Sequence, residues 1–97
     1  MGENERTVWD DPKNAINMHL RAIDFAGLDS AFDGRFAVTV EDQRRDYGEP
    51  RFNRLVELNG VVLNITFTPR GRKDRIISAR LANRKERRIY DARKQER

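Results

Sequence analysis

An Asn59-Gly60 dipeptide between two β-rich runs, residues 52–58 and 61–68, restricts the fold of this chain more than any other feature. Asn-Gly favours the left-handed backbone of a type I′ turn, whose two-residue loop matches the twist of paired strands. The turn also fixes the register, which gives the pairs Leu58–Val61, Val56–Leu63, Arg54–Ile65 and Phe52–Phe67. One face of this hairpin is therefore apolar except for Arg54, and the opposite face is polar.

A second turn, residues 69–73, predicts a third strand after the hairpin. If it is a five-residue loop, Thr68 pairs with Asp74. The apolar face then gains Ile77 and Ala79, and the polar face gains Ile76, Ser78 and Arg80. A shift of one residue turns Arg80 toward the core, so the position of Arg80 tests this register.

Helical spacing predicts two helices before the sheet and one after it. The first begins at Asp11-Pro12 and ends near Ala22, and its apolar face contains Ile16, His19, Leu20 and Ile23. The second begins after Asp24 and ends at Asp33-Gly34, with Phe25, Leu28 and Phe32 buried. A capping box at Asn83–Glu86 begins the third, which runs to about Lys94 and carries few apolar residues.

A chain of 97 residues with 37% hydrophobic residues has room for one core. We expect residues 1–6 to be a frayed tail and residues 7–97 to form a single domain. Residues 7–9 and 36–40 are β-prone, and 7–9 is expected at a sheet edge. The predicted fold class is therefore α+β, with two N-terminal helices, a twisted antiparallel sheet of three to four strands and a C-terminal helix.

Composition excludes several function classes. The chain has no Cys and one His, which excludes a disulfide scaffold and a thiolate zinc site. No apolar run approaches the roughly 20 residues of a membrane span, and the N-terminus has no signal-peptide core, so we expect a cytoplasmic protein with no membrane contact. Asp42, Asp46 and Glu49 share a loop with arginines, which favours local ion pairs over magnesium binding. No metal and no cofactor is expected.

The charge is unevenly distributed along the chain. Residues 70–97 hold twelve Lys/Arg against four Asp/Glu, whereas residues 1–69 hold eight against twelve. Such a one-sided charge attracts polyanions, of which nucleic acid is the commonest inside cells. An Arg-rich helix can also be an exposed surface helix that binds nothing. Charge alone does not distinguish this interpretation from nucleic-acid binding.

Arginines on the polar sheet face suit one kind of chemistry. RNA is cleaved without metal when the 2′-hydroxyl attacks the adjacent phosphorus, which requires a proton acceptor, a proton donor and cations at the phosphoryl oxygens. Arg51 and Arg80 supply the cations, Glu49 or Glu57 the acceptor, and Tyr90 a donor or a ring that stacks on a base. The competing interpretation is that an Arg and a Glu on one sheet face are only a structural pair.

A longer pattern extends over about residues 8–90. Its parts are Trp9-Asp10-Asp11-Pro12-Lys13 with Asn17, Ile23-Asp24-Phe25, Phe32-Asp33, Glu49-Pro50-Arg51-Phe52, Asn59-Gly60, Thr68-Pro69-Arg70-Gly71, Arg75-Ile76-Ile77-Ser78-Ala79-Arg80, and Arg84-Lys85-Glu86-Arg87-Arg88-Ile89-Tyr90. This pattern resembles the BrnT family of bacterial toxins. The resemblance implies a RelE-like fold and an endoribonuclease toxin of a type II toxin-antitoxin system that inhibits translation.

The resemblance also implies partners and site residues. The partners are an RNA substrate and a BrnA-like antitoxin whose ribbon-helix-helix part binds operator DNA, in a homodimer or heterotetramer. The implied catalytic residues are Glu49, Arg51, Arg80 and Tyr90, and the implied RNA contacts are Arg70, Lys73, Arg84 and Lys85.

One segment departs from the family pattern. Where the family usually has Lys-His-Gly, this chain has Leu20-Arg21-Ala22, so Arg21 is the candidate replacement at this position. This departure favours one alternative, a catalytically inactive homologue that binds the antitoxin in a repressor complex. A further alternative, independent of this segment, is a stand-alone nucleic-acid binder whose DNA affinity falls with salt.

Overall fold

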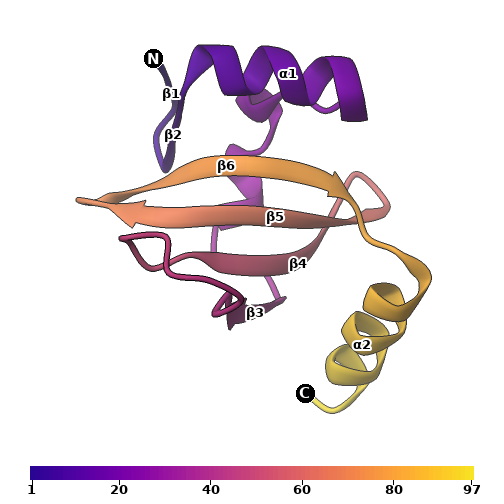
Figure 1. Cartoon of the computed structure of the whole chain (residues 1–97). Helices are drawn as coiled ribbons and strands as arrows, with labels where there is room; N and C mark the ends of the chain where they lie inside the picture. Colours follow the sequence, from indigo (N-terminus) through magenta and orange to yellow (C-terminus); the bar gives the residue numbers. More distant parts are fainter.

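The computed structural model describes residues 1–97 as a six-stranded sheet with helices on both sides (Figure 1). The elements are β1 (Gly2–Glu3), β2 (Thr7–Trp9), α1 (Asp11–Arg21), η1 (Phe25–Gly27), η2 (Asp29–Phe32), β3 (Ala37–Glu41), β4 (Phe52–Leu58), β5 (Val61–Arg70), β6 (Lys73–Leu81) and α2 (Arg84–Gln95). The α+β class is confirmed. The sheet is larger than the three to four antiparallel strands predicted, because its order is β1-β2-β6-β5-β4-β3 and β2 runs parallel to β6.

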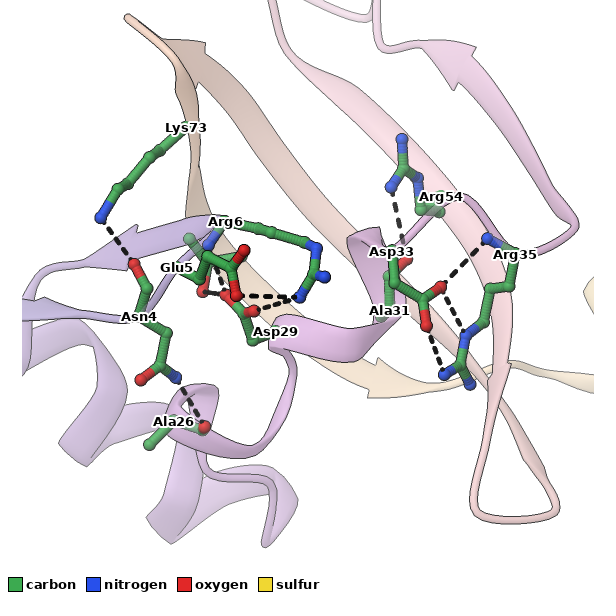
Figure 2. Close-up of polar contacts among 11 residues, drawn as sticks. Asn4, Glu5, Arg6, Ala26, Asp29, Ala31, Asp33, Arg35, Arg54 and Lys73 are labelled. Carbon is green, nitrogen blue, oxygen red and sulfur yellow. Dashed lines mark hydrogen bonds and ion pairs between the residues drawn. The ribbon is translucent and has the colours of Figure 1, made fainter.

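The N-terminal segment is part of the sheet, which corrects the expectation of a frayed tail. Gly2 and Glu3 pair with β2, and the Asn4 side chain donates to the Ala26 carbonyl over 2.9 Å. The backbone N–H and the guanidinium of Arg6 both donate to the Asp29 carboxylate, over 2.8 and 2.9 Å (Figure 2). Polar composition alone predicted fraying, and these long-range partners are invisible in local sequence.

The hairpin at Asn59-Gly60 has the predicted turn and the predicted register. Asn59 and Gly60 have φ of 52° and 85°, as a type I′ turn requires, and β4 pairs with β5 from Leu58–Val61 to Phe52–Phe67. The next turn is shorter than expected: Arg70 pairs with Lys73 across two residues rather than five. This shift of one residue places Ile76 opposite Phe67 in the core, which is wrong for the polar face predicted for it.

A β-bulge then returns the second half of β6 to the predicted faces, although not to the predicted register. Thr66 pairs with Ser78 while Phe67 pairs with Ile76, so Ile77 is the extra residue. Beyond it Ala79 is buried opposite Ile65, and Arg80 lies opposite Asn64 on the polar face. Arg80 thus occupies the predicted face, because the shorter turn and the bulge each shift the pairing by one residue and a total shift of two leaves the faces unchanged.

The predicted second helix is wrong as a continuous α-helix. Two short 3₁₀ helices, η1 and η2, replace it, and Leu28 between them has φ −102° and ψ 1°. The buried residues Phe25, Leu28 and Ala31 recur every third position, which matches the three residues per turn of a 3₁₀ helix. Asp29, inside the predicted helix, instead accepts hydrogen bonds from Arg6 and Thr7.

Helix α1 forms as predicted but buries a different face. Asp10 accepts from the Lys13 backbone as the N-cap, and Pro12 lies in the first turn. The buried residues are Asn14, which bonds the Phe25 N–H, and Asn17, which bonds the Ala79 N–H of β6. The predicted apolar face is therefore wrong: Ile16 is 60% exposed and Leu20 is 68% exposed.

The C-cap of α1 is strained. Ala22 has φ 59° and ψ 31°, a left-handed conformation that costs an L-residue about 1–2 kcal/mol. Glycine relieves the strain but loses more chain entropy on folding, about 0.5–1 kcal/mol. We expect Ala22→Gly to raise the free energy of unfolding by about 0.5–1 kcal/mol in urea titrations, a net effect of these two contributions. Ala26→Gly, at an exposed position, is the matched control and should not stabilise.

Two apolar clusters hold the layers together. The larger one packs η1 and η2 against the apolar sheet face and has Phe25, Val56, Ile65 and Ile76 fully buried. The smaller one lies on the other face, where α2 covers Val38 and Leu55 with Tyr90. The polar face is thus closed by α2 at one end and open at the other. Neither helix is long and apolar enough to cross a membrane.

Candidate functional site

A polar groove lies on the open part of this sheet face. It has a volume of about 400 Å³, and none of its lining residues is apolar. We call it the polar groove; it is lined by Glu41, Asp42, Gln43, Arg44, Asn53, Asn64, Thr66, Ser78, Arg80 and Glu86. The floor comes from the polar positions of β4, β5 and β6, and the walls come from the segment after β3 and from the first turn of α2. The groove therefore offers charged and hydrogen-bonding groups only.

Arg80 lies in this groove, and its guanidinium donates three hydrogen bonds within the protein and keeps two N–H groups free. Nη1 and Nη2 donate to the two oxygens of Glu86 over 2.8 and 2.9 Å, and Nη1 also donates to the Leu81 carbonyl over 3.2 Å. A guanidinium has five N–H donors, so Nε–H and one Nη2–H have no partner. These two donors form one edge of the planar fork, which matches two oxygens of a phosphate.

Glu86 fixes both Arg80 and the start of α2. Its carboxylate accepts from the Asn83 N–H in a capping box and from the Asn64 side chain, besides Arg80. The hydrogen bonds from Arg80, more than any other contact, hold the pKa of Glu86 at about 2. A carboxylate with so low a pKa is a weak proton acceptor, so Glu86 orients Arg80 rather than moving a proton.

The low pKa of Glu86 has a consequence for stability. Its pKa is about 2 in the folded protein and near 4.5 when unperturbed, so its contribution is present above pH 4.5 and is lost as the pH falls toward 2. We expect Glu86→Gln to unfold about 2 kcal/mol more easily than the wild type at pH 7. Because protonated Glu resembles Gln, this difference should shrink toward zero near pH 2. Urea titrations between pH 2 and 7 measure it, and a constant difference would contradict this origin.

Asn64 supplies an unused acceptor at the groove floor. Its amide nitrogen donates to Glu86 over 2.9 Å, whereas its Oδ1 is buried and has no hydrogen-bond partner. A buried acceptor without a partner costs about 1–3 kcal/mol, which a ligand donor would recover. A hydroxyl group is such a donor. Asn64 and Arg80 are direct neighbours across β5 and β6, so this acceptor lies beside the free guanidinium edge.

The wall formed by residues 41–50 is held by Asp42. Its buried carboxylate accepts from the Arg44 backbone and guanidinium and from the Tyr47 hydroxyl, and the Arg44 hydrogen bonds hold the pKa of Asp42 far below its usual range. The sequence-based interpretation of local ion pairing is confirmed for this residue. No three His, Asp or Glu side chains in the protein gather at metal-binding distance. Glu41 lines the groove and makes no side-chain hydrogen bond or ion pair, unlike Asp42 and Glu86.

Glu49 and Arg51, two of the predicted site residues, pair with each other beside this wall. Arg51 Nε lies 3.3 Å from Glu49 Oε2, and the guanidinium of Arg51 lies 4.2 Å from the centre of the Tyr47 ring. Glu49 lines a separate loop hollow of about 600 Å³, which shares Glu41, Asp42 and Gln43 with the polar groove. The strand register separates Arg51 from Arg80 by about 16–17 Å at the backbone. The two arginines therefore belong to adjoining clusters.

Arg80 also borders a second space at the end of α1. This Arg80 hollow, about 420 Å³, is lined by Leu20, Arg21, Arg80, Leu81 and Asn83. It contains two arginines and no carboxylate, in contrast to the polar groove. The segment Leu20-Arg21, which departs from the BrnT pattern, is thus brought next to Arg80. The Arg80 hollow adjoins the polar groove at Arg80, and the polar groove adjoins the loop hollow at residues 41–43.

The other predicted residues lie elsewhere. Tyr90 is 3% exposed and packs edge-on against Phe36 at 5.4 Å, so its ring has no free face for a base. Glu57 lies 3.7 Å from Lys94 and faces another hollow. Arg70 and Lys73 are at the far end of the sheet, about 23 Å along β6 from Arg80, and Lys73 donates to the Asn4 carbonyl. Arg84 and Lys85 are exposed in the first turn of α2, near Arg80.

Sequence reasoning missed most of the groove lining. The missed residues are Glu41, Gln43, Arg44, Asn53, Asn64, Thr66, Ser78 and Glu86. The hairpin register already placed Asn53, Asn64 and Thr66 on one polar face, so their alternation was a usable signal. Glu41 and Gln43 carried no such signal, since the course of residues 41–50 depends on tertiary contacts.

Comparison with known proteins assigns the family. No curated protein matches the chain. The family model for BrnT, the ribonuclease toxin of type II toxin-antitoxin systems, matches residues 9–86, from the end of β2 to the Glu86 that holds Arg80. This match covers most of the sequence and all of the polar groove, and the chain therefore belongs to the BrnT family of ribonuclease toxins of type II toxin-antitoxin systems.

Proposed function

We propose that this protein is a metal-independent endoribonuclease that cleaves RNA at the polar groove and thereby inhibits translation. The observation that carries the proposal is the free edge of the Arg80 guanidinium, which lies where the polar groove meets the Arg80 hollow. A rigid, permanently charged fork at that point suits the non-bridging oxygens of a phosphodiester. The family assignment supplies the reaction class.

The substrate phosphate is proposed to lie between Arg80 and Arg21. The Arg80 hollow holds no carboxylate, so two cations there attract a phosphate without competition. From that phosphate the strand would follow the polar groove toward the loop hollow, where Glu49 and Arg51 meet the adjoining nucleotides. A ribose hydroxyl in the groove would donate to the unpaired Oδ1 of Asn64.

Cleavage requires a proton acceptor for the 2′-hydroxyl. The groove carboxylates Asp42 and Glu86 are held by arginines, and strand pairing places Glu41 opposite Phe52, far from Arg80. We therefore propose that solvent water accepts the 2′-hydroxyl proton, and we treat Glu49, implied by the family pattern, as a contact to the next nucleotide. The 2′-oxygen bonds to phosphorus, the bond to the 5′-oxygen breaks, and the products are a 2′,3′-cyclic phosphate and a 5′-hydroxyl protonated by water.

A comparison of RNA and DNA oligonucleotides of one sequence tests this function. The purified protein, in the presence of a chelator, should cut only the RNA and leave 2′,3′-cyclic phosphate ends, because DNA has no 2′-hydroxyl. Intact RNA, or products with 5′-phosphate ends, would overturn the proposal. Induction in cells without the antitoxin should arrest growth and protein synthesis.

An inactive homologue that serves only as an antitoxin-binding module is the second candidate. It is favoured by Leu20, an apolar residue that lines the Arg80 hollow at a position where the family usually has lysine. Induction without the antitoxin separates the two functions, since a binding module leaves growth unchanged.

The family context suggests the partners. We propose a BrnA-like antitoxin with a ribbon-helix-helix part, assembled with this chain in a heterotetramer in the cytoplasm. Co-purification followed by light scattering measures the stoichiometry, and an operator fragment added to the complex tests DNA binding through the antitoxin.

A further inference from the structure

We infer that the surface between α1 and β6 is the docking site of the antitoxin, and that it receives an acidic amphipathic helix which also covers Arg80. We call this surface the α1–β6 face; it consists of Lys13, Ile16, Leu20, Arg21, Ile77 and Leu81. That docking stops RNA cleavage rests on the proposed function, whereas the docking itself does not.

The first observation is an apolar stripe that the fold leaves uncovered. Ile16 and Leu20 are one helical turn apart on α1 and are 60% and 68% exposed, and Leu81 of β6 is 60% exposed. The helix instead buries Asn14 and Asn17. A single exposed apolar residue is ordinary, but a contiguous group at helical spacing marks a surface for another protein.

The second observation is the shape of this surface. One hollow of about 300 Å³ lies between α1 and Ile77, and the Arg80 hollow continues it toward Leu81; Leu20 and Arg21 line both. From Ile77 to Leu81 the surface runs about 13 Å along β6, which is the length of about nine residues of a helix. A partner helix of two to three turns fills such a space.

The edge of β6 indicates a helix rather than an added strand. Strand β2 pairs only with Asp74–Ile76, so the edge beyond Ile76 has no neighbouring strand. The Ala79 N–H on that edge is already bonded to the Asn17 side chain over 3.1 Å. This bond interrupts the row of free backbone groups that strand addition needs.

Charge defines the chemistry of the partner. The two hollows contain Lys13, Arg21 and Arg80, and no Asp or Glu. A partner with carboxylates beside its apolar residues complements this surface and is steered to it at low salt. Because Arg80 lines both the Arg80 hollow and the polar groove, a carboxylate placed there occupies the position proposed for the substrate phosphate.

The test measures, by calorimetry, the binding of a purified BrnA-like antitoxin to full-length variants of this chain. Ile16→Glu should weaken binding at least 30-fold, because it places a charge in the centre of the apolar contact. Met18→Glu is the matched control: Met18 is 42% exposed on the same helix but lines neither hollow, and its effect should stay within threefold. Circular dichroism verifies that both variants fold.

The outcomes are distinct. Unchanged binding by Ile16→Glu, or equal losses in both variants, would overturn the inference. It would also be overturned if the wild type alone were a dimer and Ile16→Glu a monomer, since a second copy would then cover this surface. If Ile16→Glu cleaves RNA like the wild type but resists inhibition, the docking and the proposed function both hold. If no variant cleaves RNA but binding follows the prediction, only the proposed function fails.

Discussion

Replacing Arg80 by alanine is expected to lower the rate of RNA cleavage by about 10²–10³-fold, because the transition state loses the free guanidinium edge where the polar groove meets the Arg80 hollow. Arg80→Lys should recover little of this rate, since an ammonium keeps the charge but not the two parallel donors. Initial rates on a fluorescent RNA oligonucleotide, measured at saturating and at limiting substrate, check both variants.

The matched control for Arg80 is Arg72→Ala, which removes the same charge from the turn at the far end of the sheet. Its rate should stay within about threefold of the wild type, a change expected for a distant surface charge. Equal losses in the two variants would show that net charge, not the fork, drives cleavage. Full activity of Arg80→Ala would remove Arg80 from the mechanism.

Deletion of Ile77 is expected to abolish cooperative folding. Without the bulge one half of β6 must reverse its faces, so either Arg80 turns into the core or Ile76 turns out of it. Burying an unpaired guanidinium costs more than about 4 kcal/mol, a large part of the stability of a small domain. The thermal transition followed by circular dichroism should disappear.

Ile77→Ala is the control for this deletion, because it shortens the same side chain and keeps the residue count. Ile77 is half-buried, so the loss should be about 1 kcal/mol and the thermal transition should remain. A folded deletion variant with native activity would show that the bulge is dispensable for placing Arg80.

The sequence predicted the parts of the fold that depend on local signals. Asn59-Gly60 determined the hairpin and four residue pairs, and the capping box located the start of α2. The failures have a common cause. Residues 7–9 form a strand as predicted, but β2 lies between β1 and the distant β6 rather than at the sheet edge. Helix α1 buries asparagines because these bond Phe25 and Ala79. Contacts between distant segments outweigh local periodicity at each of these places.

In the candidate site, too, local signals predicted some residues, whereas contacts between distant segments determined the others. Arg80 was placed on the correct face although the turn and the bulge were missed, because their two one-residue shifts together leave the faces of β6 unchanged. Tyr90 could not be told apart from an exposed aromatic residue, because its burial depends on how α2 packs against Phe36. The approach of Arg21 to Arg80 joins residues 59 positions apart, and no local pattern predicts such a contact.

The parallel pairing of β2 with β6 has a consequence for synthesis of the toxin in the cell. Strand β2 leaves the ribosome early, yet its neighbour in the sheet is the last strand to be made. The groove also needs Glu86 of α2, so it cannot assemble until nearly the whole chain has been translated. A nascent or truncated chain therefore lacks the complete groove, and under the proposed function it gains the ability to cleave RNA only after nearly all of the chain has been made.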